Sequence, residues 1–174
     1  SWDEMMDTAL EMGFSGIEVY NLPKFDPMLD RGGPFHKSQC AATVRQLKEK
    51  PTHIFLQAGV GSMAGAMAGF FRNYYGEDCP FITVVEPERA NCLFRTAKAN
   101  DGTLHNVTGD MNTIMAGLAC GEPCTIGWEI LSRCADHFIS CPDYVAAKGM
   151  RILGNPAAGD DRVISGESGA ACFG

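Results

Sequence analysis

The stretch that decides the fold is PTHIFLQAGVGSMAGAMAG, residues 51–69. Residues 53–56 form an apolar run that is too short for a helix and predicts a buried strand. A turn of small residues, 57–62, follows, and residues 63–75 predict a helix with Ser62 as its N-cap. This arrangement favours phosphate binding, because backbone N–H groups freed by the glycines meet the positive end of the helix dipole.

We therefore expect five consecutive residues to bind a phosphate through their backbone: Gly59, Val60, Gly61, Ser62 and Met63. Gly61→Asp would then place a charge in the site. The alternative is a tight strand–helix turn without a ligand. A dinucleotide-binding fingerprint is excluded because Ala64 stands where its third glycine belongs. A nucleoside-triphosphate loop is excluded because no lysine follows the turn. A phosphorylated cofactor therefore fits this turn better than a nucleotide.

The composition sets limits on the class of protein. The chain has 174 residues, 45% hydrophobic and 20% charged, as expected for one globular domain with a sizeable core. Its net charge of −7 argues against a nucleic-acid surface, and no apolar run is long enough to span a membrane. Because Ser1 is not an initiator methionine, we expect a piece of a longer protein. No signal sequence opens the chain, which predicts a reducing, cytoplasmic compartment.

The eight cysteines include no CxxC pair. A group near the middle of the chain invites a zinc interpretation: Cys120, Cys124, Cys134, His137 and Cys141. Their spacings do not form the paired knuckles of structural zinc sites. We expect free, buried thiols and no metal.

Apolar runs alternate with amphipathic stretches along the rest of the chain. Strands are predicted at 81–85 and 138–140, and helices at 38–50, 88–98, 127–135 and 142–153. This alternation predicts an α/β fold with a mostly parallel sheet, helices on both faces and ligands at the carboxyl ends of the strands. We divide the chain into a diverged or unmatched N-terminal segment, 1–36, and part of a cofactor-binding α/β domain, 37–174.

Six motifs in one order carry a family resemblance: QAGVGSMAGAMAGFF, VVEPERANC, GDMNTIMAGLACGEP, GWEILSRCADHFISCPD, RILGNP and ISGESGA. Together they resemble the diaminopropionate ammonia-lyases, pyridoxal-phosphate enzymes of the tryptophan-synthase-β and threonine-dehydratase fold. The resemblance implies pyridoxal 5'-phosphate, a homodimer and conversion of 2,3-diaminopropionate, a small amino acid, to pyruvate and ammonia. One alternative is a serine or threonine dehydratase on the same fold. Another is a non-catalytic fragment that binds phosphate or a partner chain.

The resemblance also implies roles for single residues. Asp7 partly matches a motif that carries a catalytic aspartate, although a solvated carboxylate on a helix at 2–14 is an alternative. Four residues are expected just behind the groups that contact the cofactor: Glu86, Asp110, Gly117 and Glu167. Asp110 or Asn112 would also suit the N-cap of an ordinary helix.

The same resemblance leads to expectations for two cysteines. In relatives such as serine racemase, a glutamate and an aspartate six residues later hold a divalent ion. Here Cys92 follows Glu86 at that spacing, so we expect no such ion. We expect Cys92 and Cys120 to lie near each other, with a reversible disulfide or none. The alternative is two unrelated buried cysteines.

Pyridoxal-phosphate chemistry needs a lysine that binds the cofactor covalently. None of the six lysines lies in the family's context for this residue: Lys24, Lys37, Lys48, Lys50, Lys98 and Lys148. We expect that lysine upstream of this chain, and the serine or threonine that meets the pyridine nitrogen downstream. The chain should therefore carry only the phosphate half of the site and be inactive alone.

Overall fold

The computed structural model describes residues 49–174. The strands are β1 (His53–Gln57), β2 (Phe81–Pro87) and β3 (His137–Cys141). The longer helices are α3 (Ser62–Tyr75), α4 (Cys92–Ala99), α5 (Thr125–Cys134) and α6 (Asp143–Gly154). Short elements complete the described part: α7 (Glu167–Ala170) and the 3₁₀ turns η1 (Gly76–Asp78), η2 (Ala116–Leu118) and η3 (Ala171–Phe173).

The three strands form one parallel sheet in the order β1-β2-β3. In the register, Leu56 lies opposite Val84, and Val84 lies opposite Phe138. Successive residues of a strand point to opposite faces, so each face of the sheet needs its own cover.

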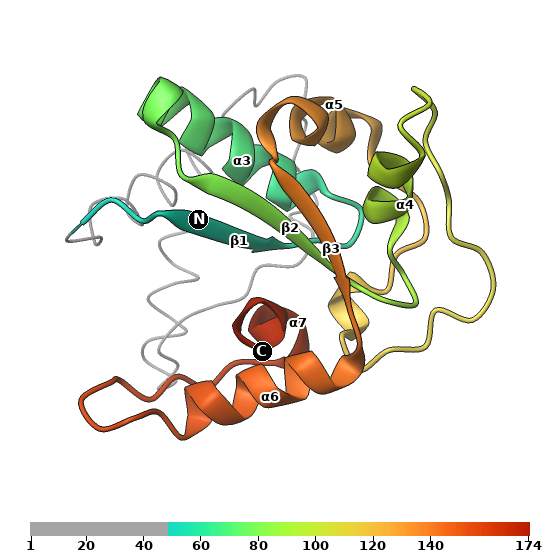
Figure 1. The fold of residues 1–174 in the computed structure, drawn as a ribbon. Coiled ribbons are helices and arrows are strands. Elements are labelled where there is room, and N and C mark those ends of the chain that lie inside the picture. Colours follow the sequence, from blue (N-terminus) through green and yellow to red (C-terminus); the bar gives the residue numbers. More distant parts are fainter. Residues whose placement is uncertain (1–48) are drawn as a thin grey trace, which may run out of the picture. The chain divides into compact units, whose positions relative to one another are not determined.

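Helices cover both faces of this sheet (Figure 1). On one face, α3 and α5 pack over Leu56, Ile82 and Val84. On the other, α6 and the C-terminal turns pack around Val85 and Cys141. The predicted α/β class, with a parallel sheet and helices on both faces, is confirmed.

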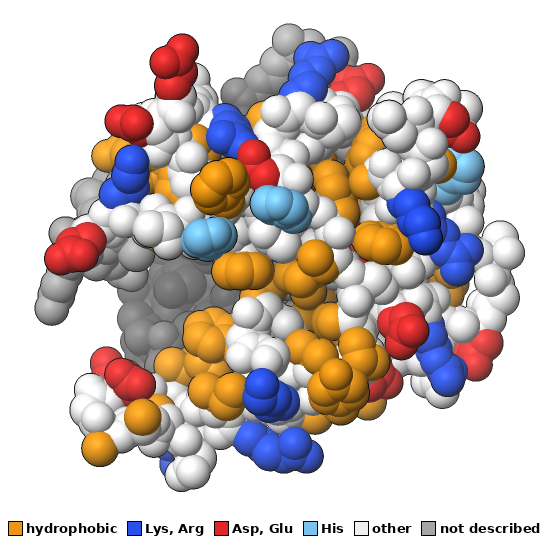
Figure 2. All heavy atoms as spheres, in the orientation of Figure 1, with side chains coloured by type: hydrophobic (Ala, Val, Ile, Leu, Met, Phe, Trp, Pro, Cys, Tyr) orange, Lys and Arg blue, Asp and Glu red, His pale blue; other side chains and the backbone are white. Residues whose placement is uncertain are grey.

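The second face is only partly covered. Phe55, Phe81 and Ile139 remain 48%, 55% and 41% exposed. Figure 2 shows hydrophobic side chains gathered on the face viewed there, over α6 and the neighbouring part of the sheet. A parallel sheet is normally buried on both faces, so this surface is unlike that of a complete α/β domain.

Two of the predicted helices differ from the observed ones. The helix predicted from residue 88 begins at Cys92, because residues 88–91 form a turn in which the Ala90 N–H donates to the Pro87 carbonyl. Only η2 is helical within residues 110–118. There the Asp110 carboxylate caps a turn by accepting the Asn112 N–H, so it is not a helix N-cap.

The start of the described part corrects a third prediction. Glu49 is a bend and Lys50 is irregular, so the helix predicted at 38–50 does not reach its expected end. A residue before proline is disfavoured in helical conformation, and Pro51 follows. The rest of that helix, the segment 1–36 and Asp7 lie outside the described residues. No helix in the described range is long and apolar enough to cross a membrane.

Candidate phosphate-binding site

The predicted phosphate turn lies at the carboxyl end of β1. The Ala58 N–H donates to the Val85 carbonyl at 2.9 Å, which holds the end of β1 against β2. The chain then turns, and Gly61 adopts φ 93°, a left-handed conformation that favours glycine. Gly61, not Ser62, is the N-cap, and Ser62 is the first residue of α3. The helix starts one residue earlier than predicted because glycine can make this turn itself.

Six consecutive backbone N–H groups, those of residues 59–64, have no hydrogen-bond partner within the part of the chain that the structure describes. Ser62 and Met63, within this series, are both exposed, and Met63 is 48% exposed. The fourteen-residue α3 adds the partial positive charge of its N-terminus. Free donors at a helix start form an anion-binding site, so the residues present fit a phosphate group.

The underside of the turn is packed against two leucines. A Cβ at Gly61 would lie 3.0 Å from Leu93 Cδ1 and 3.2 Å from Leu131 Cδ1. Both leucines are fully buried. A side chain at Gly61 would therefore enter the core and not the space above the N–H groups. Our expectation that Gly61→Asp places a charge in the phosphate site is wrong for this reason.

Helix α5 supports the turn from a second side. The Cys124 N–H donates to the Val60 carbonyl at 2.8 Å. A Cβ at Gly127 would lie 2.8 Å from the Gly61 carbonyl oxygen, so α5 can approach this closely only with glycine there. Sequence reasoning missed both residues. A lone glycine inside a helical pattern was the available signal, because such glycines often mark close packing.

Two cysteines flank Gly59. The Cys120 Sγ lies 3.1 Å from the position of a Cβ at Gly59, and the Gly117 carbonyl oxygen lies 3.4 Å from it. The Cys92 thiol donates to the Gly59 carbonyl at 3.8 Å. Both cysteines are free thiols. Their predicted mutual approach stays a prediction, although each lies beside the same glycine.

Glu86 is fully buried at the end of β2. Its Oε1 accepts the Leu93 N–H at 2.9 Å and its Oε2 accepts the Phe94 N–H at 2.6 Å. Burial raises the pKa of Glu86 to about 7, against these N–H groups, which lower it. The carboxylate therefore caps the start of α4. Within residues 49–174, no three His, Cys, Asp or Glu side chains converge as metal ligands.

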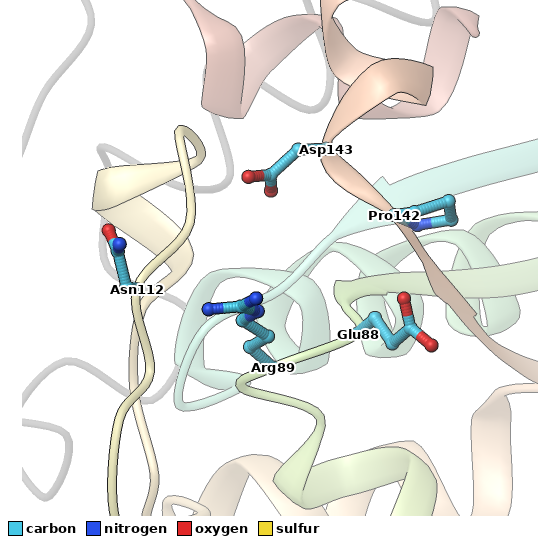
Figure 3. Close-up of a pocket in the computed structure, with 5 residues that line it drawn as sticks. All are labelled: Glu88, Arg89, Asn112, Pro142 and Asp143. Atoms are coloured by element: carbon cyan, nitrogen blue, oxygen red, sulfur yellow. The ribbon is translucent and has the colours of Figure 1, made fainter.

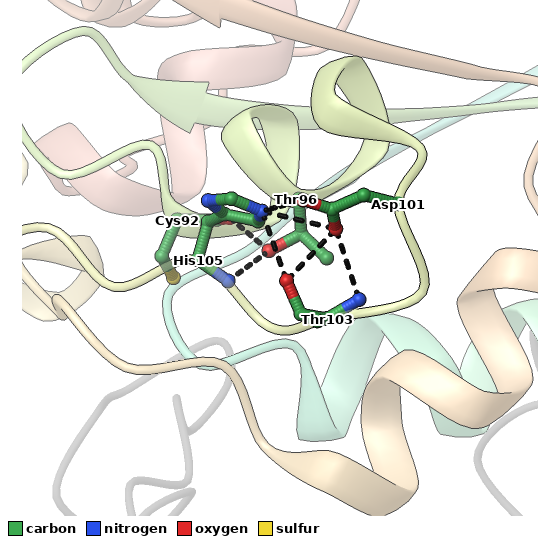
Figure 4. Close-up of polar contacts among 5 residues, drawn as sticks. All are labelled: Cys92, Thr96, Asp101, Thr103 and His105. Atoms are coloured by element: carbon green, nitrogen blue, oxygen red, sulfur yellow. Dashed lines mark hydrogen bonds and ion pairs between the residues drawn. The ribbon is translucent and has the colours of Figure 1, made fainter.

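The other end of α4 is held by a polar network (Figure 4). The Thr96 hydroxyl donates to the Cys92 carbonyl at 2.8 Å and accepts the His105 N–H at 2.9 Å. In the loop beyond, Asp101 accepts the Thr103 N–H and pairs with His105 Nε2 at 2.9 Å. Bonds from Thr103 and His105 lower the pKa of Asp101 to about 2. Helix α4 is thus fixed at both ends.

The remaining predicted residues fall in two places. The Gly117 N–H donates to the Ser168 Oγ at 3.1 Å, which brings the residue beside Glu167 to the segment that touches Gly59. Glu167 itself is exposed at the start of α7. Asp110 is exposed elsewhere, with its Oδ2 3.6 Å from Arg89 Nη1. The structure thus groups Gly117 with the phosphate turn and leaves Asp110 in an exposed ion pair with Arg89.

A polar cavity of about 300 Å³ opens near the carboxyl ends of β2 and β3 (Figure 3). It is lined by Glu88, Arg89, Asn112, Pro142 and Asp143. The Asp143 carboxylate accepts the Thr113 hydroxyl and, at 3.2 Å, the Ile114 N–H. These bonds anchor the segment before η2 to the start of α6, so Asp143 serves the fold here.

The three lysines in the described residues make contacts away from the phosphate turn. Lys50 Nζ donates to the Asp78 carbonyl and Lys148 Nζ to the Gly174 carbonyl, each at 3.0 Å. Lys98 Nζ lies 6.0 Å from the centre of the Phe94 ring. None of these three contacts is with the phosphate turn.

The model of the family described as "Pyridoxal-phosphate dependent enzyme" matches residues 1–173. The chain therefore belongs to this family of pyridoxal-phosphate-dependent enzymes. Within it, the chain is similar to diaminopropionate ammonia-lyase. It is 45% identical to that enzyme from Escherichia coli (strain K12) over 99% of its own length, and it spans 41% of the length of that relative. The match to the Salmonella typhimurium enzyme is 57% identical, covering 69% of this chain and 30% of the relative.

Solved structures agree with this assignment. Holo diaminopropionate ammonia lyase from E. coli superposes with a TM-score of 0.72 and 40% identity, over 98% of this chain and 43% of that one. The processed form of threonine deaminase isoform 2 from Solanum lycopersicum gives a TM-score of 0.69 at 19% identity, over 95% of this chain and 43% of that one. The second comparison shows the shared fold alone.

Proposed function

We propose that this chain carries the phosphate half of the cofactor site in a carbon–nitrogen lyase that converts 2,3-diaminopropionate to pyruvate and ammonia. The observation that carries the proposal is the run of unpaired N–H groups at residues 59–64, at the start of α3. The 45% identity to the E. coli enzyme supports the choice of reaction. When bound, pyridoxal phosphate supplies an electron sink for charge that develops on the substrate.

The chain's own residues bind and orient the phosphate. N–H groups from Gly59 to Ala64 donate to its oxygens, and the α3 dipole favours its negative charge. Because Gly61 and Gly127 have no side chains, Leu93 and α5 can pack closely against the turn and hold it in one conformation. The lysine that binds the cofactor and the group that meets the pyridine nitrogen come from other parts of the whole protein.

Met63 offers the sharpest test of the phosphate site, because its side chain is exposed in the first turn of α3. In the full-length protein, Met63→Glu adds a negative charge where it stabilises the helix but repels a phosphate. We expect a loss of pyridoxal-phosphate affinity of tenfold or more, without a lower melting temperature. The matched control, Met63→Gln, has nearly the same shape and should lose about threefold or less. Equal affinities for the two variants would refute the site.

The reaction is tested by ammonia release from the full-length protein with 2,3-diaminopropionate, serine and threonine. A relative, the E. coli enzyme, has been solved in complex with D-serine, which supports a small amino acid as substrate. We expect the highest kcat/KM for 2,3-diaminopropionate. A higher value for serine or threonine would identify a dehydratase instead. Failure to bind pyridoxal phosphate would favour a non-catalytic role for the chain.

The isolated chain should be inactive. Mixing it with pyridoxal phosphate and reducing with borohydride should give no stoichiometric label on one lysine. A specific label would show that the cofactor-binding lysine lies in this chain after all.

We also propose the setting of the whole protein: a homodimer in the cytoplasm, with residues 37–174 in its cofactor-binding domain and 1–36 as a diverged segment. In a reducing compartment the cysteines would stay as free thiols. Light scattering of the full-length protein measures the oligomeric state, and a monomer would contradict this part of the proposal.

A further inference from the structure

Three fully buried residues, Glu86, Cys92 and Leu93, connect the end of β2 with the first turn of α4. The Glu86 carboxylate accepts the N–H groups of Leu93 and Phe94, which are among the unpaired donors at any helix start. The Cys92 Sγ also lies 3.8 Å from the Glu86 Oε1, which is an alternative acceptor to the Gly59 carbonyl for the single thiol proton. One carboxylate therefore sets the position of the first three residues of α4.

The same turn of α4 contacts both glycines of the phosphate turn. The Cys92 thiol also lies 3.8 Å from the Gly59 carbonyl oxygen. The two Leu93 δ-carbons lie 3.0 and 3.1 Å from the position of a Cβ at Gly61. Consecutive residues of α4 thus contact the first and third residues of the turn whose N–H groups have no partner in the described part of the chain.

Glycines give the turn its shape but no rigidity. Gly61 has φ 93°, and neither glycine has a side chain that could restrict its own backbone. Unpaired N–H groups that point to one place need external support to stay there. On this side of the turn, the support comes from residues that Glu86 holds.

We propose that Glu86 is a positioning residue for the phosphate turn, acting through Cys92 and Leu93. The inference rests on the proposed function of that turn. Glu86 touches no phosphate itself. It fixes the first turn of α4, and α4 fixes the conformation of Gly59 and Gly61, whose N–H groups have no partner in the described part of the chain.

The test compares affinities for pyridoxal phosphate and pyridoxal in the full-length protein. It is done at pH 8 with a reducing agent, so that Glu86 is largely ionised and the thiols of Cys92 and Cys141 stay free. Glu86→Gln puts an amide NH₂ against one of the two α4 N–H groups, so one bond is lost. Cys92→Ala removes the thiol contact with Gly59. Cys141→Ala is the matched control, because it removes a buried thiol from the core on the other face of the sheet.

We expect Glu86→Gln to weaken pyridoxal-phosphate binding about tenfold and Cys92→Ala about threefold, the range of one hydrogen bond. Pyridoxal lacks the phosphate, so its affinity should change less than about twofold. Cys141→Ala should leave both affinities unchanged. A loss that is equal for the two ligands would show a general structural role and overturn the proposal.

If Glu86→Gln does not fold, Cys92→Ala against Cys141→Ala decides the question. Equal pyridoxal-phosphate affinities for those two variants would overturn the positioning role. A wild-type protein that binds no pyridoxal phosphate would instead refute the proposed function itself, so the two failures are distinguishable.

Discussion

The two ends of helix α3 differ in whether their polar groups have hydrogen-bond partners. At its C-terminal end, Arg72 Nη2 lies 2.7 Å from both Asp136 carboxylate oxygens, and Arg72 Nε donates to the Cys134 carbonyl at 2.9 Å. Asp136 also accepts the Ile82 N–H at 2.7 Å. At the N-terminal end, the N–H groups of residues 59–64 have no partner in the described part of the chain.

At the C-terminal end, which we call the closed end, the polar groups bind one another and hold the helix in place. At the N-terminal end, which we call the open end, the N–H groups remain available for a ligand. The C-terminal network ties α3, α5 and the amino ends of β2 and β3 together, and places a cation where the helix dipole is negative. The N-terminal end is supported by packing of leucines and glycines beneath it. Its donors are thereby left for a ligand. A protein that paired them internally would be held at both ends and would bind nothing there.

The largest expected effect comes from breaking the packing under the open end. In Gly127→Ala, the new Cβ would lie 2.8 Å from the Gly61 carbonyl oxygen and 2.9 Å from its carbon. Neither backbone can give way without moving α5 or the turn. We expect more than about 3 kcal/mol of destabilisation, together with weaker pyridoxal-phosphate binding. Denaturant unfolding and cofactor titration of the full-length protein measure the two effects.

The control for this change is Gly154→Ala at the end of α6, where a Cβ would meet nothing within 4 Å. That variant should be neutral or up to about 1 kcal/mol more stable. Comparable stability of the Gly127 and Gly154 variants would mean that α5 does not support the turn.

The sequence predicts the open end better than the closed one. The strand before Gly59, the turn and α3 follow from local patterns, since glycines and apolar runs act over a few residues. The contacts beneath the turn join residues such as Gly61 and Gly127, which lie far apart in the sequence. Side-chain networks such as Arg72 with Asp136 leave no local pattern at all.

The helix boundaries show the same limit. The sequence predicts the start of α4 four residues too early because charged residues 88 and 89 suit a helix surface. Its true start depends on Glu86, a carboxylate that precedes the helix and caps it. Such a cap lies outside the usual pattern, in which the residue next to the helix supplies the bond.

The pH dependence of stability tests Glu86, which holds the first turn of α4 beneath the open end of α3. Burial raises its pKa from 4.5 to about 7, so the native state binds a proton that the unfolded state releases. Its contribution to stability is therefore complete below pH 4.5 and is lost as the pH rises through 7. The whole change amounts to about 3 kcal/mol at most.

Glu86→Gln cannot titrate, so the difference in unfolding free energy between wild type and variant should fall between pH 4.5 and 7. It should be constant above about pH 8. Urea unfolding of the full-length protein at a series of pH values measures it. A difference that stays flat across the whole range would mean that Glu86 keeps an ordinary pKa.

The smallest effect is expected at the closed end. Asp136→Ala removes the partner of Arg72 and leaves the Ile82 N–H without an acceptor. Both charged side chains are about a quarter exposed, with 29% and 27% of their surface accessible, so water offsets part of the loss. We expect about 2 kcal/mol of destabilisation. Asp161→Ala, at an exposed carboxylate, is the matched control and should change stability by less than about 0.5 kcal/mol.

Cofactor affinity decides what the Asp136 result means. The network lies at the end of α3 away from the phosphate turn, and a folded Asp136→Ala protein keeps every N–H group of residues 59–64. Its pyridoxal-phosphate affinity should therefore match that of Asp161→Ala within about twofold, although its unfolding midpoint is lower. A tenfold loss of affinity in this variant would show that the two ends of α3 are coupled. The division between a structural end and a binding end would then be wrong.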